Sequence, residues 1–288
     1  MTRKAWSHFL FVGLLWGIPY LLMKVAVKEL PPVAIVAGRT AIGAAMLIPY
    51  AIYQKTFSEA LKNYKTIAIY AATEMAGPWM LITTAEKKIS SGLAGLLIAT
   101  TPIWSTIFTA LKGDKSVLHS KRLLGIVMGF AGMVALIGID AIKGSLHIPS
   151  VLMVIIASVC YAYAVMRVTE KLPGVSGIAI NGLAMAMVSI VYAPFAIALW
   201  PENGVSAQSI NSLIALGVFS TGFAFVYFFK VMAEIGPARA SLVTYINTAF
   251  AVVLGILILG EPLTLGVSIG LPIVLYGSYL ASRKSKSL

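Results

Sequence analysis

Long apolar segments follow one another along this chain of 288 residues, and short polar segments separate them. An α-helix needs about 20 mostly apolar residues to cross a bilayer, because ~30 Å of hydrocarbon divides by ~1.5 Å of rise per residue. The chain is 59% hydrophobic and only 11% charged, too little polar surface for a water-soluble domain of this size. We therefore expect an all-α membrane protein with ten transmembrane helices, at residues 6–27, 32–53, 66–85, 92–111, 123–139, 149–168, 175–199, 212–229, 238–259 and 265–281.

The positions of Lys and Arg predict the orientation of these helices. Sixteen of the 22 Lys and Arg residues fall in segments on the same side as the N-terminus, five fall on the other side, and Arg39 lies within a span. Positive residues accumulate in cytoplasmic segments, so we expect both termini in the cytoplasm. The same distribution accounts for the net charge of +12 and indicates no nucleic acid partner.

Several function classes lack the residues that they need. Cys160 is the one cysteine, so the sequence allows no disulfide within the chain and no cysteine-based metal site. The three histidines are far apart and show no metal-ligand spacing. A glycine-rich phosphate loop followed by Lys-Ser/Thr is missing, which argues against direct use of ATP. We expect no cofactor and no metal.

The second half of the chain repeats the pattern of the first. Residues 29–33 (ELPPV) match residues 171–175 (KLPGV), each at the start of the second span of its half. Gly113-Asp114 matches Gly260-Glu261 in the same way. Each repeat has five spans, so the second repeat enters the membrane from the opposite side. The sequence thus predicts two inverted repeats, residues 1–145 and 146–288, as in many secondary transporters, whose sites lie near the midplane between the repeats.

The duplicated five-helix unit, the Leu-Pro-Pro-Val turn and the Gly-Glu-Pro-Leu-Thr turn at residues 260–264 resemble the drug/metabolite transporter superfamily, EamA type. The resemblance covers essentially the whole chain and is strongest for amino-acid and metabolite exporters of the YddG kind. It implies a central cavity between the repeats, with the fifth and tenth helices at the side, and a place in the bacterial inner membrane. The first repeat departs from the pattern, with Gly113-Asp114-Lys115 where Gly-Glu-Pro is usual.

Two charged residues lie deep within predicted spans. Glu74 is ~13 Å from the inner edge of the third span, and Arg39 is ~10 Å from the outer edge of the second. A charge at this depth costs at least a few kcal/mol unless it is paired, protonated or in contact with water. Glu74 therefore binds a proton or a substrate amine, or it holds neighbouring helices together. Arg39 pairs with Glu74, binds a substrate carboxylate or extends toward the interface.

Polar and aromatic side chains from several other spans reach the same depth, as do three prolines. Helix–helix hydrogen bonding explains any one of them, but their convergence favours a wet, partly aromatic cavity for a small amphipathic solute. The predicted substrate-binding residues are Trp16, Tyr20, Arg39, Glu74, Trp79, Thr101, Tyr163, Asn181, Tyr245 and Asn247. The predicted hinges, or static kinks, are at Pro19, Pro78 and Pro102.

Pairs of glycines on the fifth and tenth spans allow close helix contact. Gly125 and Gly129 match Gly266 and Gly270, each pair with the spacing of a small-xxx-small motif. The two helices either pack together within the chain or support a homodimer.

These patterns together favour a secondary transporter in the lipid bilayer rather than an enzyme. We expect it to move small amphipathic metabolites, amino acids first, by alternating access, with protons as a candidate coupling ion. A sugar-phosphate, nucleotide-sugar or drug antiporter of the same superfamily is the alternative. A membrane-embedded enzyme would need several His, Asp, Glu or Cys residues at one depth, and the sequence places only Glu74 there.

Overall fold

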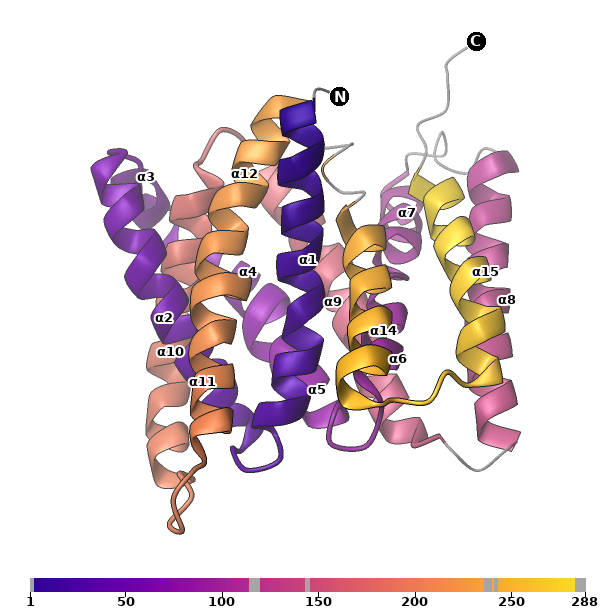
Figure 1. Ribbon diagram of the computed structural model, residues 1–288. Coiled ribbons are helices and arrows are strands. Elements are labelled where there is room, and N and C mark those ends of the chain that lie inside the picture. Colours follow the sequence, from indigo (N-terminus) through magenta and orange to yellow (C-terminus); the bar gives the residue numbers. More distant parts are fainter. Residues whose placement is uncertain (1–2, 114–119, 143–145, 236–239, 241–242, 283–288) are drawn as a thin grey trace.

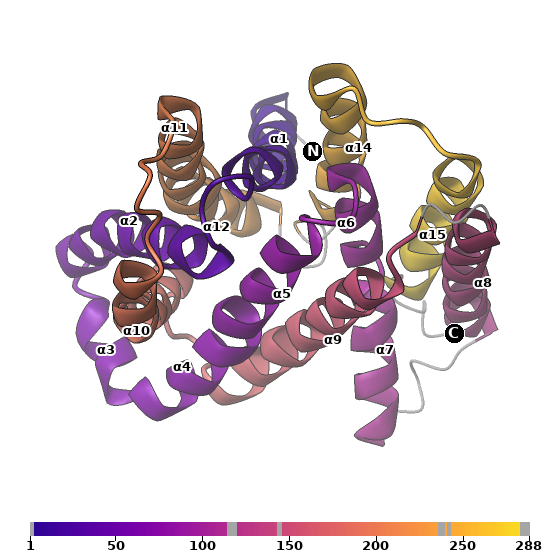
Figure 2. The same ribbon diagram turned by 90° about the horizontal axis from the view of Figure 1, so that it is seen from below.

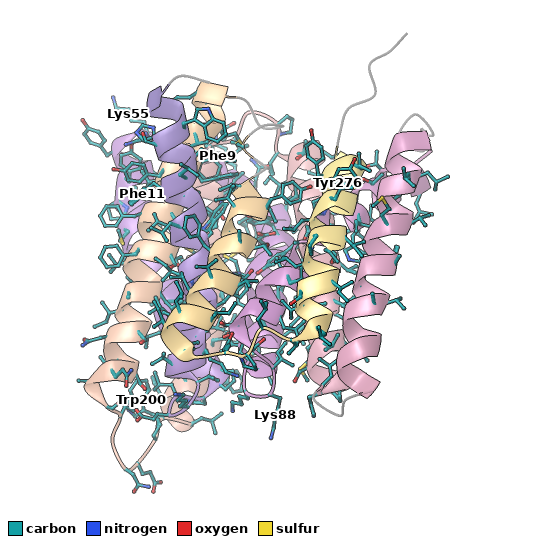
Figure 3. The ribbon with its side chains drawn as sticks, turned by 45° about the vertical axis from the view of Figure 1, so that its right-hand side comes forward. Phe9, Phe11, Lys55, Lys88, Trp200 and Tyr276 are labelled. Atoms are coloured by element: carbon teal, nitrogen blue, oxygen red, sulfur yellow. The ribbon has the colours of Figure 1, made fainter. Side chains whose placement is uncertain are left out.

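The computed structural model describes residues 3–113, 120–142, 146–235, 240 and 243–282, and these residues form helices and connecting turns without any strand. Figure 1 shows that α1 (Arg3–Ala26) begins and α15 (Leu265–Ser282) ends on the same side of the molecule, which we call the terminal face. The opposite side, the far face, carries the turns at residues 27–31, 86–90 and 260–264. Lys55 lies at the terminal face, whereas Lys88 and Trp200 lie at the far face (Figure 3).

The first half of the chain contains eight α-helices and a π-helical segment. Pro31 is an extended N-cap and Pro32 opens α2, where a missing N–H costs nothing. Ser90 caps α6 by accepting a hydrogen bond from the Leu93 N–H at 3.2 Å. After α1 the elements are α2 (Pro32–Tyr53), α3 (Phe57–Lys62), α4 (Tyr64–Tyr70), η1 (Ala71–Ala76), α5 (Gly77–Ala85), α6 (Ser91–Ile98), α7 (Thr101–Leu111) and α8 (Ser120–Ile142).

The second half follows a similar order. His147 caps α9 through the Ser150 N–H, and Ser206 caps α11 through the Ser209 N–H. The elements are α9 (Ile148–Lys171), α10 (Gly177–Ala198), α11 (Ala207–Ala215), η3 (Leu216–Phe223), α12 (Ala224–Ile235), α14 (Val243–Leu259) and α15. The predicted start of the ninth span, residue 238, lies outside the described residues.

The helices confirm an integral membrane protein. Six of them, in the described residues, are long and apolar enough to cross a bilayer, and three shorter apolar helices accompany them. The prediction missed the amphipathic α3 between the second and third spans and did not divide the predicted spans at residues 66–85 and 92–111. The count of ten spans and the cytoplasmic place of the termini stay predictions.

α8 and α15 lie side by side at one edge of the molecule, apart from the helices around its centre (Figure 2). Their contact is close because glycines face each other. A Cβ on Gly277 of α15 would lie 2.8 Å from the Gly125 carbonyl oxygen and 2.9 Å from the Gly129 Cα. Gly125 and Gly129 are therefore used within the chain, and a homodimer through the two glycine pairs stays a prediction.

π-helical segments interrupt the third membrane helix of each half. η1 lies between α4 and α5, and η3 lies between α11 and α12. The Tyr192 hydroxyl of α10 donates to the Ala76 carbonyl at the end of η1, at 3.1 Å. The Thr221 hydroxyl donates to the Leu216 carbonyl within η3, at 2.8 Å. Such segments leave backbone groups without regular α-helical partners and occur frequently at functional sites.

Candidate functional site

A cavity of about 830 Å³ lies between the two halves of the chain. Side chains from α1, α2, α4, η1, α5, α6, α7, α9, α10, η3, α12 and α14 line it. Its inner end is formed by Met23 and Ile82, which lie near the far-face ends of α1 and α5, and by Ile98, the last residue of α6, which begins at the far face. The wall is mainly apolar with a few polar groups, the usual composition of a site for a small organic molecule.

Arg39 is the most constrained polar side chain in this wall. Its guanidinium carbon lies 3.8 Å from the centre of the Trp79 ring. Its Nε and Nη2 point at the Thr221 Oγ1 at 3.4 and 3.2 Å, and its Nη1 has only the Met23 sulfur at 3.6 Å. The side chain is 5% exposed and still lines the cavity. Arg39 therefore does not extend toward the interface, and the weakly bound Nη1 is available to an anion.

Glu74 also lines the cavity, from the middle of η1. Its Oε2 is buried and has no hydrogen-bond partner. A buried carboxylate without a partner is costly, so this group binds a proton or takes a donor from a molecule in the cavity. The structural alternative, in which Glu74 holds helices together, finds no support in the contacts of the described residues.

Arg39 and Glu74 share the cavity but do not contact each other. Within the described residues no ion pair joins them, because Arg39 is engaged with Thr221 and Trp79. Tyr161 of α9 also lines the cavity, close enough to both groups for their charges to act on its hydroxyl. The predicted direct pair is thus absent from this conformation, and the two charges are free to bind different parts of one ligand.

Asn181 is held by two hydrogen bonds. Its Oδ1 accepts from the Tyr70 hydroxyl at 3.0 Å, and its Nδ2 donates to the Gly177 carbonyl at 2.8 Å. Asn181 and Tyr70 both line the cavity, so this bond joins α4 of the first half to α10 of the second across its wall. The bond fixes the orientation of the amide.

Most of the residues predicted from the sequence face this one cavity. Tyr163 is the exception among the ten binding residues, because its ring packs against Phe108 at a centroid distance of 6.3 Å. Pro78 and Pro102 each stand at the start of a helix, where proline is compatible with helix geometry, and Pro19 lies inside a continuous α1. The residues in the cavity wall are Trp16, Pro19, Tyr20, Arg39, Glu74, Trp79, Thr101, Pro102, Asn181, Tyr245 and Asn247.

Sequence reasoning missed several residues of the site. Tyr70 precedes Glu74 by one helical turn, so its place on the same face could have been inferred. Thr221 contacts Arg39 but is not part of the cavity wall, which Ser220 lines instead, and the sequence does not predict the π-helical turn of η3 that sets these orientations. The sequence does not single out Met23, because an apolar side chain is ordinary within a membrane span.

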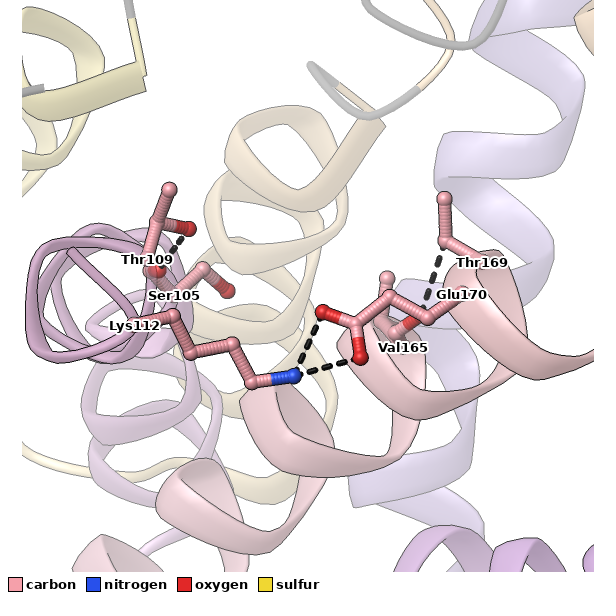
Figure 4. Close-up of polar contacts among 6 residues, drawn as sticks. All are labelled: Ser105, Thr109, Lys112, Val165, Thr169 and Glu170. Carbon is pink, nitrogen blue, oxygen red and sulfur yellow. Dashed lines mark hydrogen bonds and ion pairs between the residues drawn. The ribbon is translucent and has the colours of Figure 1, made fainter. Parts of the chain in front are cut away.

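The cavity reaches the surface at the terminal face. Thr109 of α7, Thr169 of α9 and Thr244 of α14 line it near the ends of their helices, and Thr169 is exposed. Figure 4 shows the rim, where Lys112 forms an ion pair with both carboxylate oxygens of Glu170. The hydroxyls of Thr109 and Thr169 donate to their own helices, at the Ser105 and Val165 carbonyls.

Hydrogen bonds between the halves close the far face. The Glu261 carboxylate, in the turn after α14, accepts from the Ser91 N–H at 2.7 Å, the Ser91 hydroxyl at 2.8 Å and the Gly92 N–H at 3.2 Å. Glu29 in turn accepts from the Ser206 N–H at 2.8 Å. Both carboxylates therefore bind the N-terminus of a helix in the other half, where the helix dipole favours a negative charge.

The first half of the broken fourth helix packs directly on α14. The Thr248 hydroxyl donates to the Gly95 carbonyl at 3.2 Å, and a Cβ on Gly95 would lie 2.8 Å from the Ala251 Cβ. Beyond the break at residues 99–100, α7 and α14 diverge, and both line the cavity. The cavity is thus closed at the far face and accessible from the terminal face.

Comparison with known proteins agrees with this architecture. The chain matches the EamA-like transporter family twice, over residues 5–138 and 148–283. It is 26% identical to an uncharacterized transporter of Archaeoglobus fulgidus, over 98% of this chain and 99% of the relative. It is 24% identical to the uncharacterized transporter YoaV of Bacillus subtilis, over 96% of each chain.

The uncharacterized inner membrane transporter YedA of Escherichia coli is also 24% identical, over 94% of this chain and 90% of its own. A protein of known crystal structure shares the fold with a TM-score of 0.68 and 19% identity, over 98% of this chain and 97% of that one. Two family matches that together cover most of the chain, on an all-helical membrane fold, establish that this protein belongs to the EamA-like transporter family of the drug/metabolite transporter superfamily.

Proposed function

We propose that this protein is a secondary transporter that exports small amphipathic metabolites, above all amino acids, across the bacterial inner membrane by alternating access. The observation that carries the proposal is the placement of Arg39 and Glu74, unpaired with each other, in the wall of one aromatic cavity. An amino acid has a carboxylate, an ammonium and a side chain, and this cavity offers a group for each.

The polar groups of the cavity wall suit a zwitterionic substrate. A guanidinium binds a carboxylate through parallel N–H bonds, and the Arg39 Nη1 would exchange the weak Met23 sulfur for a carboxylate oxygen. The Glu74 carboxylate can accept from an ammonium, which would satisfy its unpartnered oxygen. The rings of Trp16, Phe225 and Phe228 add apolar surface that suits aromatic side chains.

The shape of the cavity supports alternating access. It is accessible at the terminal face, which the distribution of Lys and Arg assigns to the cytoplasm, so this conformation corresponds to an inward-facing carrier. The two family matches, one in each half, support a pair of inverted repeats. Exchange of the conformations of the two repeats would then close the terminal face and open the far face.

The alternatives fit the cavity less well. A sugar-phosphate carrier needs several cations, and Arg39 is the one Lys or Arg residue among the described residues of the wall. A membrane-embedded enzyme needs clustered ionisable groups, and the described residues contain no group of three or more His, Cys, Asp or Glu that could hold a metal. A carrier of lipophilic cations would use Glu74 and the aromatic rings without Arg39, so it is the second candidate.

Counterflow in proteoliposomes tests the proposal. Vesicles loaded with one unlabelled amino acid should take up the labelled form faster than empty vesicles, and the uptake should saturate. The free amino acid should compete, whereas its methyl ester and its N-acetyl derivative should not, because each lacks one of the two charges. Arg39→Gln and Glu74→Gln should each reduce counterflow by at least ~10-fold, the loss expected for one charge-assisted hydrogen bond.

Two results would overturn the assignment, and a third would show how Arg39 and Glu74 act together. Folded protein without counterflow for any amino acid would exclude the amino-acid class. Competition by the ester alone would favour a carrier of organic cations. A double variant whose loss is much smaller than the sum of the single losses would show that Arg39 and Glu74 are energetically coupled in spite of their separation.

A further inference from the structure

A second buried carboxyl group lies outside the cavity, between its inner end and the far face. Glu86 directly follows α5, and Ile82, one turn earlier, is part of the cavity wall. The Glu86 side chain is 0% exposed, and neither of its carboxyl oxygens has a hydrogen-bond partner. No other described glutamate has both side-chain oxygens buried and without a hydrogen-bond partner.

The lysine next to Glu86 does not neutralise this carboxyl by direct contact. Lys24 of α1 donates to two main-chain carbonyls, those of Glu86 at 2.5 Å and Ile89 at 2.6 Å. Its ammonium therefore binds the carbonyl of the residue that ends α5, where the helix dipole favours a cation, and a carbonyl of the turn that follows. No ion pair between the Lys24 and Glu86 side chains is present in the described part of the chain.

The charged and titratable groups around Glu86 come from three parts of the fold. Tyr20 and Lys24 face it from α1, Arg39 from α2 and Glu261 from the turn after α14. Burial raises the pKa of the Glu86 carboxyl well above its usual range; Lys24 and Arg39 oppose this change, and Glu261 adds to it. A carboxyl that is fully buried and unpartnered is stable in its neutral form and strongly unfavourable in its charged form.

The surroundings of Glu86 depend on the closed far face. Glu86 begins the turn that leads to α6, and Glu261 of the other half both faces Glu86 and binds the first residues of α6. Separation of the two halves at the far face would therefore bring water to Glu86. In water a glutamate has a pKa of about 4.3 and is ionised at neutral pH.

We propose that Glu86 is a proton-binding site that takes up one proton when the far face closes and releases it when the far face opens. The proposal rests on the alternating access proposed above, because a face that never opens would never change the environment of Glu86. Proton binding at Glu86 would couple the opening of the far face to the proton gradient, separately from any proton bound by Glu74 in the cavity.

The sign of the pH dependence follows from this cycle. The closed state holds the proton and the open state does not, so closure is fully favoured at low pH. This contribution is lost as the pH rises through the raised pKa that Glu86 has in the closed state. Between the two pKa values, the ratio of closed to open molecules should fall by up to ~10-fold per pH unit, the dependence of a single proton.

Spin labels at the far face test this link without any substrate. Lys88→Cys and Leu263→Cys place labels on exposed positions of the two turns that Glu261 brings together, and Cys160→Ser removes the native thiol. The distance between the labels would be measured by double electron–electron resonance in the reconstituted protein from about pH 5 to about pH 9. We expect a short distance at low pH and a growing population of longer distances as the pH rises.

Three variants decide the origin of the transition. Glu86→Gln, which is permanently neutral, should keep the short distance at every pH, whereas Glu202→Gln, at an exposed carboxylate in the far-face loop, should behave like the wild type. Lys24→Met keeps Glu86 but removes the nearest cation, so its transition should move to higher pH. If Glu86→Gln does not fold, Lys24→Met still tests the proposal.

A wild-type distance that does not change with pH would overturn the proposal, as would a Glu86→Gln variant that follows the wild-type curve. Failure of the transport proposal would look different. In that case proteoliposomes would show no counterflow, while the labels would still report a transition that depends on Glu86.

Discussion

The two ends of the molecule join the halves of the chain by different kinds of contact. At the far face, carboxylates bind backbone N–H groups at helix N-termini, and glycines let α6 and α14 touch. At the terminal face, the described contacts between the halves include the pairs Lys112–Glu170 and His8–Glu234, whose side chains are partly exposed. Exposed pairs contribute about 0–1 kcal/mol, whereas hydrogen bonds to a partly buried carboxylate such as that of Glu261 contribute about 1.5–3 kcal/mol. The difference between these polar contacts agrees with a conformation that is closed at the far face.

The largest expected effect is on the accessibility of the two ends. With Cys160→Ser as background, Thr109→Cys should react with a polar thiol reagent at least ~100-fold faster than Val252→Cys, because Thr109 lines the cavity and Val252 is buried where α14 contacts α6. If Val252→Cys reacts only when the far face is open, a rate ~100-fold lower than that of Thr109→Cys means that the open state makes up about 1% of the molecules. Reaction rates in detergent would measure it, and equal rates would contradict a closed far face.

Glu261→Gln should weaken the far face by roughly 2 kcal/mol, because neutral hydrogen bonds replace charge-assisted ones at the N-terminus of α6. The labelling rate of Val252→Cys should rise about 30-fold in this variant, the factor that 2 kcal/mol represents. Lys112→Met, at the terminal face, serves as the control and should leave that rate unchanged. A rate that does not respond to Glu261→Gln would show that the carboxylate contributes nothing to closure.

Gly95→Ala should open the far face by about 1 kcal/mol, since its Cβ would lie 2.8 Å from the Ala251 Cβ and the two helices would have to separate slightly. The expected rise in Val252→Cys labelling is about 5-fold. Ser105→Val adds bulk to α7 on the cavity side and should have no such effect. If both variants act alike, close packing of α6 on α14 does not distinguish the two ends.

The loop that Glu29 binds should respond to acid in the opposite sense to Glu86. Hydrogen bonds from the Ser206 hydroxyl and N–H, and from Ser209, lower the pKa of Glu29. The contribution of Glu29 is therefore complete at neutral pH and is lost as the pH falls through this lowered pKa. A spin label on Asn203→Cys should become more mobile there, while Glu29→Gln should give a mobile label throughout.

The smallest expected effect is at the terminal face itself. Lys112→Met removes an ion pair whose side chains are 46% and 43% exposed, so the free energy of unfolding should fall by less than about 1 kcal/mol. Thermal unfolding of the purified protein would measure it. A loss of several kcal/mol would show that the terminal face is as strongly held as the far face.

The residue types and their depth in the predicted spans were enough to identify eleven of the 32 residues that line the cavity. The second span is observed at the predicted residues, Pro32–Tyr53, because Pro31 and Pro32 mark its start unambiguously. Arg39, Glu74 and Asn181 were selected because polar groups at mid-depth need a reason to be there, and they do line the cavity.

What the sequence did not reveal depends on contacts between distant parts of the chain. The π-helical turns of η1 and η3 have no periodicity of their own and follow from packing. Glu86 was placed just past the third span, where a charge is ordinary. Its side chain is buried close to the charged groups of Lys24 and Glu261, which lie 62 and 175 positions away in the sequence.

The break between α6 and α7 has a mechanical consequence. Thr100 at the break contacts the Ser158 hydroxyl of α9 at 3.1 Å and accepts from the Trp104 indole at 3.2 Å, so this point of the chain is anchored while α7 extends from it to the terminal face. α7 is about 16 Å long, and a tilt of about 10° around the anchor would move its free end by about 3 Å. With α6 fixed on α14, a rotation this small changes the width of the entrance at the terminal face by roughly the diameter of one water molecule.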